Sequence, residues 1–128
     1  MTCFWDGILQ KLNTDDFRSI SIGVKPRNRD FVNVLKMKNT KTIGMKWNNK
    51  YITKQQIDEN FTAIKEYNPQ TMYNGYFCST FEPFLFLVSY IFKCKIIHNY
   101  MGHKMTYEPP VIKKTLRFSS DRGHFWAN

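Results

Sequence analysis

The sequence has 128 residues, of which 42% are hydrophobic and 16% aromatic, and its formal net charge is +9. This length and composition predict a single domain over residues 1–128 with a sizeable core, and they exclude a disordered chain. The three cysteines have no CxxC spacing, which argues against a disulfide framework or a zinc site and favours a reducing compartment.

The first predicted element is a helix over residues 4–13, where apolar residues recur at helical spacing. Gly7 lies inside this pattern at a cost of about 1 kcal/mol relative to alanine, so we expect a neighbouring segment to pack closely there. Cys3 stands directly before the helix. A thiol at this position is placed to become a thiolate, because a helix N-terminus stabilises negative charge. Residues 13–16 are expected to end the helix.

Three more helices follow in the predicted order. One covers residues 29–38, and another starts after Thr53, where the sequence has the form of a capping box, and stops before residue 68. Residues 68–79 form a loop. The last helix begins at residue 79 or 80 with Glu82 and Pro83 in its first turn. Its apolar run, residues 84–92, is far shorter than the roughly 20 residues of a membrane span.

The hydrophobic period then changes to that of strands. Strands are predicted over residues 94–100 and 111–119, with a turn at Gly102, and a last strand begins at His124. Helices first and strands last indicate an α+β fold, in which N-terminal helices pack on a small C-terminal sheet.

A histidine on a strand can act as the general base for a nucleophilic thiol if the fold brings the chain ends together. Cys3 followed by His124 is therefore the first candidate pair, and it needs no cofactor. By period-two alternation Asn128 shares the strand face of His124 and is the first candidate to orient it, with Asp121 and Asp6 as alternatives.

The other cysteines and histidines give weaker candidates. Cys78 precedes the apolar helix and is a second possible nucleophile, with His98 or His124 as its base, whereas Cys94 is expected in the core. His98 and His103 flank a turn without cysteine or carboxylate partners of ligand type, so no metal site is predicted.

The chain resembles the ovarian-tumour (OTU) cysteine proteases, which are papain-like, and in particular their compact viral forms. The resemblance rests on Cys3 at a helix start, the loop Tyr73-Asn74-Gly75 before an apolar helix, and the ending Gly123-His124-Phe125. It implies a deubiquitinase, a thiol protease that hydrolyses the bond after the C-terminal tail of ubiquitin or a ubiquitin-like modifier. Cys3 is then the nucleophile, His124 the base, and Tyr73, Asn74 and Gly75 line the channel for the tail.

Two departures from the family keep other functions open. Trp126 stands where the family has an orienting Asn or Asp, and only two residues precede Cys3, so the loop that helps to build the oxyanion hole is not in this sequence. This fits either a piece of a larger protein or a minimal, inactive member. The alternative function is a basic structural or virion-associated protein that binds an acidic partner or nucleic acid. A third is a protease that processes a viral polyprotein. The likeness to viral forms implies the host cytoplasm or a virion, and no secretion signal is recognised.

Overall fold

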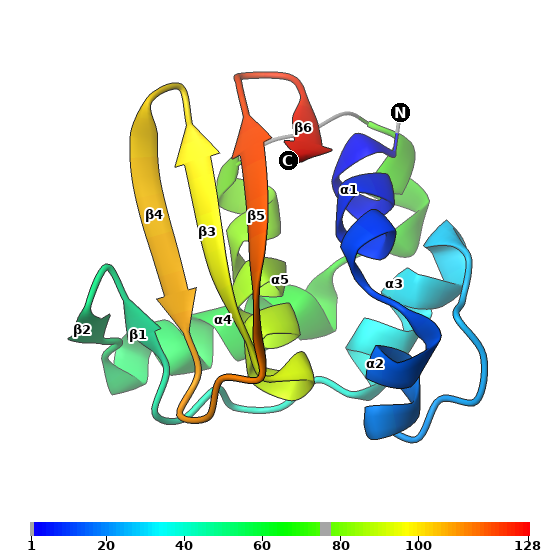
Figure 1. The fold of residues 1–128 in the computed structure, drawn as a ribbon, viewed down its shortest axis with the longest axis horizontal. Coiled ribbons are helices and arrows are strands. Elements are labelled where there is room, and N and C mark those ends of the chain that lie inside the picture. Colours follow the sequence, from blue (N-terminus) through cyan, green and yellow to red (C-terminus); the bar gives the residue numbers. More distant parts are fainter. Residues whose placement is uncertain (1, 75–77) are drawn as a thin grey trace.

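The computed structural model describes residues 2–74 and 78–128. In this part of the chain the helices are α1 (Cys3–Lys11), α2 (Thr14–Ser19), α3 (Asn28–Met37), α4 (Lys54–Glu66), the 3₁₀ helix η1 (Pro69–Tyr73) and α5 (Cys78–Phe92). The strands are β1 (Lys46–Trp47), β2 (Lys50–Tyr51), β3 (Cys94–Tyr100), β4 (His103–Glu108), β5 (Lys114–Ser120) and β6 (Phe125–Ala127) (Figure 1). The predicted α+β class is confirmed.

The strands form one mixed sheet with the order β2-β1-β4-β3-β5-β6, in which only β3 and β5 run parallel. The sheet was predicted to be C-terminal. The hairpin β1–β2, which lies between α3 and α4 in the sequence, corrects this prediction. The strand β4 was not predicted at all. Of its residues only Tyr107 is fully buried, which leaves almost no alternation of apolar and polar residues to recognise.

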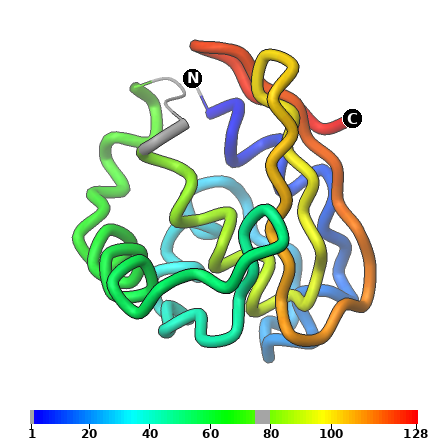
Figure 2. The backbone as a smooth tube through the Cα atoms, turned by 90° about the vertical axis from the view of Figure 1, so that its left-hand side faces the viewer, coloured from blue at the N-terminus to red at the C-terminus, as the bar shows by residue number. Residues whose placement is uncertain are grey.

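The fold has two layers. Figure 2 shows β3, β4 and β5 on one side of the molecule and α4 and α5 on the other. Trp5 of α1 is fully buried between the layers. Aromatic rings surround it with centroids 4.9 to 6.0 Å away, and they come from Phe4, Phe31, Tyr67, Phe81 and Phe84. A ring cluster of this kind links α1 to α3 and α5.

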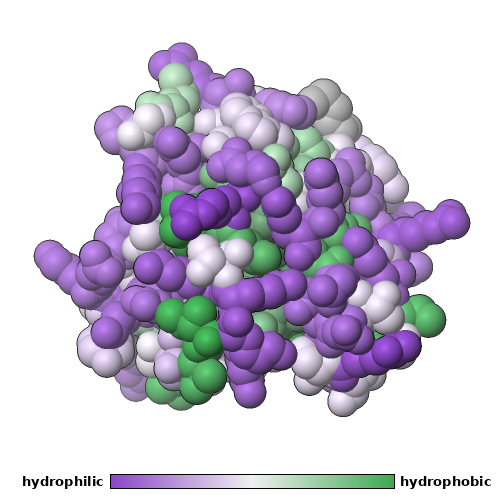
Figure 3. Space-filling model, in the orientation of Figure 1, coloured by the Kyte–Doolittle hydropathy of each residue, from purple (hydrophilic) through white to green (hydrophobic). Residues whose placement is uncertain are grey.

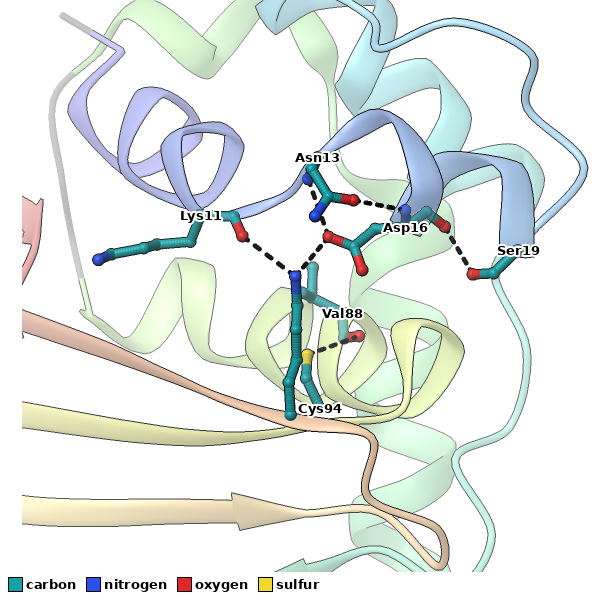
Figure 4. Close-up of polar contacts among 7 residues, drawn as sticks. Lys11, Asn13, Asp16, Ser19, Val88 and Cys94 are labelled. Atoms are coloured by element: carbon teal, nitrogen blue, oxygen red, sulfur yellow. Dashed lines mark hydrogen bonds and ion pairs between the residues drawn. The ribbon is translucent and has the colours of Figure 1, made fainter.

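The segment after α1 differs from the prediction, because Asn13 begins a second helix as well as following the first. The Asn13 Oδ1 accepts a hydrogen bond from the Asp16 N–H, and the Asp16 carboxylate accepts one from the Asn13 N–H. Figure 4 shows Asp16 with Asn13 and Ser19 beside it. The same carboxylate lies 2.5 Å from the Lys114 Nζ of β5. The start of α2 is thereby tied to the start of β5.

The apolar helix α5 begins at Cys78, one or two residues earlier than predicted. Glu82 and Pro83 are therefore its fifth and sixth residues rather than members of its first turn. Within the described residues, the model contains no helix with the length and apolar character needed to cross a membrane.

Candidate active site

Cys3 is the first residue of α1 and is half-buried against the edge of the core. Its thiol forms no disulfide. The preceding residue, Thr2, does not cap the helix through its side chain. Instead its hydroxyl donates to Asp6 at 2.8 Å, and the Asn28 amide donates to both Thr2 and Asp6. Thr2 and Asn28 thus both donate hydrogen bonds to the Asp6 carboxylate. Asp6, which was an alternative to Asn128 for orienting His124, therefore already has other partners.

The ends of the chain are brought together, as the predicted chemistry requires. The rings of Phe4 and Phe125 lie 4.9 Å apart, and α1 packs along β6. Gly7 allows this approach, because a Cβ atom there would lie 3.0 Å from the Phe125 ring and 3.6 Å from the Ala127 nitrogen. The predicted close packing at Gly7 is therefore confirmed.

His124 directly precedes β6 and is exposed. Its imidazole is stacked on the indole of Trp126, with centroids 5.6 Å apart and planes 25° from parallel. Strand alternation turns Phe125 toward α1, and Trp126, paired with Ser119, toward the opposite side of the sheet. Among the described residues, no hydrogen bond or ring contact joins His124 to Cys3. The backbone segments meet, but the two side chains point to different sides of β6.

Asn128 and Asp121 also make contacts that do not involve the imidazole. The Asn128 Oδ1 accepts from the Ser119 hydroxyl at 2.9 Å. The Asp121 Oδ1 accepts from the backbone N–H groups of Gly123 and His124 at 3.0 and 2.8 Å. Asp121 therefore shapes the turn that carries His124, and Asn128 fastens the end of β6 to β5.

The predicted tail-binding loop is described in part. Tyr73 ends η1 with 55% of its surface exposed, and Asn74 follows it, also exposed. Gly75 lies outside the described residues. The first turns of α1 and α5 are neighbours, because Phe4 stacks on Phe81 with centroids 4.6 Å apart. Figure 1 shows these helix starts and β6 at the same end of the molecule.

The same end contains a buried polar pair that was not predicted as such. His98 of β3 is 0% exposed, and its Nε2 is 2.6 Å from the Ser120 hydroxyl. Its ring packs on Phe125, and its Nδ1 has no hydrogen-bond partner among the described residues. Burial lowers the pKa of His98 to about 4, which keeps the ring neutral near pH 7. The burial of His98 could have been predicted from strand alternation, which places it on the same face as Cys94 and Ile96.

Of the remaining polar candidates, Cys94 is buried and Glu82 is hydrogen-bonded within the fold. Burial raises the pKa of the Cys94 thiol to about 12, so this cysteine is unreactive and belongs to the core as predicted. Burial also raises the pKa of Glu82, whose carboxylate accepts a hydrogen bond from the Tyr107 hydroxyl at 2.8 Å. His103 is exposed, and the described residues contain no cluster of three or more metal-ligating side chains.

Compared with protein-family models, with curated proteins and with solved structures, the chain has no significant match.

Proposed function

We propose that the chain is a papain-like thiol hydrolase of the OTU type. Its substrate is the isopeptide or peptide bond after the C-terminal tail of ubiquitin or a ubiquitin-like modifier. The observation that carries the proposal is the contact between Phe4 and Phe125. These residues directly follow Cys3 and His124, so nucleophile and base belong to two backbone segments that touch.

In the proposed reaction the thiol proton of Cys3 passes to His124 while the sulfur attacks the carbonyl carbon at the end of the tail. The C–N bond breaks as His124 returns the proton to the leaving amine, and the acyl group remains on the sulfur as a thioester. Water then hydrolyses the thioester, which releases the carboxylate and restores the thiol.

This reaction requires the imidazole of His124 to leave the indole of Trp126 and turn toward α1. Both side chains are exposed, and exposed side chains change rotamer within nanoseconds. The turn of residues 121–124 has to rearrange as well, because a rotamer change alone does not move the ring across β6. Asn128 orients the ring only if its bond to Ser119 opens.

The oxyanion of the reaction needs hydrogen-bond donors, and the start of α1 offers the Cys3 N–H. The first N–H groups of a helix have no partner within the helix, and the Thr2 side chain does not cap them. A missing second donor costs about 10²- to 10³-fold in rate, so we expect slow turnover unless the tail-binding loop around Tyr73 and Asn74 supplies it.

The test is reaction with ubiquitin that carries a thiol-reactive electrophile at its C-terminus, followed by intact mass. We expect an adduct of one ubiquitin with the wild type and with the matched control Cys94→Ala, and none with Cys3→Ala. His124→Ala is expected to slow the reaction by about 10²- to 10⁴-fold. An adduct that survives in Cys3→Ala but disappears in Cys78→Ala would move the nucleophile to α5.

A second candidate is a non-catalytic binding protein with the same fold. It is favoured by the His124–Trp126 stack and by the hydrogen bonds that engage Asp6 and Asn128. This candidate would be favoured if no ubiquitin-like electrophile labels Cys3 in protein that circular dichroism shows to be folded.

A further inference from the structure

One side of the sheet is not covered by the helices. On the helix side, Cys94, Ile96 and His98 of β3 are buried. Lys95 alternates to the other side, and the strand register continues that side from β2 to β6. We call it the open face. It is defined here by Tyr51 of β2, Lys46 of β1, Lys104 of β4, Lys95 of β3, Arg117 of β5 and Trp126 of β6.

The open face is strongly cationic. Lys46, Lys95, Lys104 and Arg117 form no ion pair with any carboxylate of the described residues, and Glu108 is the acidic side chain on this face. The carboxylates are concentrated elsewhere, since eight of the ten acidic residues lie in helices. Figure 3 shows this side of the molecule as mostly hydrophilic, with small and separate apolar patches. Helices and strands carry six basic residues each, so the strands have an excess of positive charge because they contain only one carboxylate, that of Glu108.

Two aromatic rings mark the edges of the open face. Tyr51 is 70% exposed and Trp126 is 40% exposed. They belong to the two edge strands of the sheet, β2 and β6, which lie roughly 24 Å apart at a strand spacing of about 4.8 Å. The strand register also offsets the two residues along the strand direction. The Lys46 Nζ lies 4.9 Å from the centre of the Tyr51 ring. Cations thus lie beside and between two exposed π surfaces.

We propose that the open face binds single-stranded nucleic acid. Its bases stack on Tyr51 and Trp126, and its phosphates contact Lys95, Lys104 and Arg117. An uncovered sheet face with exposed rings fits bases that are unpaired and splayed out, whereas a duplex hides the base faces. An acidic polypeptide would account for the cations but leaves both rings unused. This binding does not require the Cys3 thiol, although the Trp126 ring that it uses also contacts His124.

The test is fluorescence anisotropy with a labelled 12-nucleotide oligouridylate, measured on Cys3→Ala protein over a series of salt concentrations. We expect Tyr51→Ala to weaken binding about tenfold, in line with the loss of one stacked base. The pair Lys95→Gln and Arg117→Gln is expected to weaken binding further and to reduce the slope of log K against log salt by about 1.4, or about 0.7 for each lost phosphate contact.

The matched control is the pair Lys54→Gln and Lys65→Gln, which removes the same charge from exposed positions of α4. It is expected to bind within about twofold of its parent, because it leaves the open face intact. Equal losses in the control pair and the open-face pair would overturn the proposal in favour of diffuse charge. Tighter binding of a duplex, or equal competition by polyglutamate, would overturn it as well. Thermal melts establish that each variant is folded.

Discussion

The two sides of β6 differ sharply over consecutive residues. Phe125 is 1% exposed and packs against Phe4 and Gly7, whereas its neighbour Trp126 is 40% exposed and stacks on His124. One side thus holds the termini together, and the other carries the groups available for chemistry and binding. The strand period of two separates the buried side from the side that carries the proposed functions, so substitutions on the two sides should change different measurements.

The largest expected effect is the loss of Phe125. Phe125→Ala removes a buried ring that contacts Phe4, Phe118 and His98, and it should lower the free energy of unfolding by about 3–5 kcal/mol. Trp126→Ala on the other side should lower it much less, by about 1 kcal/mol, because the indole is 40% exposed. Urea denaturation of both variants checks the contrast, and similar losses in the two would break it.

The buried side should also be sensitive to acid through His98. Its pKa is lowered from 6.5 to about 4 in the folded chain, so above pH 6.5 the ring is neutral in both states. As the pH falls from about 6.5 to 4, the unfolded chain takes up a proton that the folded chain does not. The free energy of unfolding therefore decreases in this pH window by up to about 3 kcal/mol, since each pH unit between the two pKa values is worth about 1.36 kcal/mol.

The measurement is the free energy of unfolding as a function of pH for the wild type and for His98→Gln. The glutamine does not titrate, so the variant should lose less stability between pH 6.5 and 4 even if it is less stable throughout. Parallel curves for the two proteins would assign the acid sensitivity to other groups.

A smaller effect is expected where α1 meets β6. Gly7→Val places a branched side chain against the Phe125 ring and should destabilise the fold by about 1–3 kcal/mol through overpacking. The cost should fall in a Phe125→Leu background, because the smaller side chain leaves room. Gly23→Val is the matched control, since a Cβ atom at Gly23 meets nothing within 4 Å. Additive effects of Gly7→Val and Phe125→Leu would contradict a direct contact.

Trp126→Ala is expected to have the smallest effect on stability but a measurable effect on the reactivity of Cys3. It removes the surface on which the His124 ring rests and should increase the rate of Cys3 labelling by the ubiquitin electrophile severalfold. The rate is compared with that of Tyr51→Ala, which removes an exposed ring at the far edge of the sheet. A decrease specific to Trp126→Ala would mean that the indole assists the reaction.

Local signals in the sequence predict much of the helical part. The capping box at Thr53 is present, with the Thr53 hydroxyl accepting from the Gln56 N–H, and α4 starts where predicted. At Asn13 the same kind of motif begins α2, where only a helix end is predicted because residues 13–16 directly follow the first helix. A capping residue between two helices both follows one and starts the next, and spacing alone does not distinguish these cases.

The candidate site is predictable only in its coarse geometry. Cys3 at the start of α1 follows from periodicity, and Gly7 predicts a close neighbour for this helix, but nothing in the sequence identifies β6 as that neighbour. The direction of the His124 side chain does not follow from the sequence either, because it depends on one register position of β6 and on a contact with Trp126. The open face was not predicted either, since Lys95, Lys104 and Arg117 are dispersed in sequence and gather only through the pairing of β3 with β4 and β5.

The packing of α1 on β6 has a consequence for the order of folding. The helix α1 packs mainly on β6, which lies more than 100 residues further along the sequence. The ion pair between Asp16 and Lys114 spans 98 residues in the same way. Because distant contacts are closed at a high entropic cost, α1 should reach its native packing late, after β3, β4 and β5 have paired. During synthesis on a ribosome, the native surroundings of Cys3 cannot form until residues 125–127 have been made.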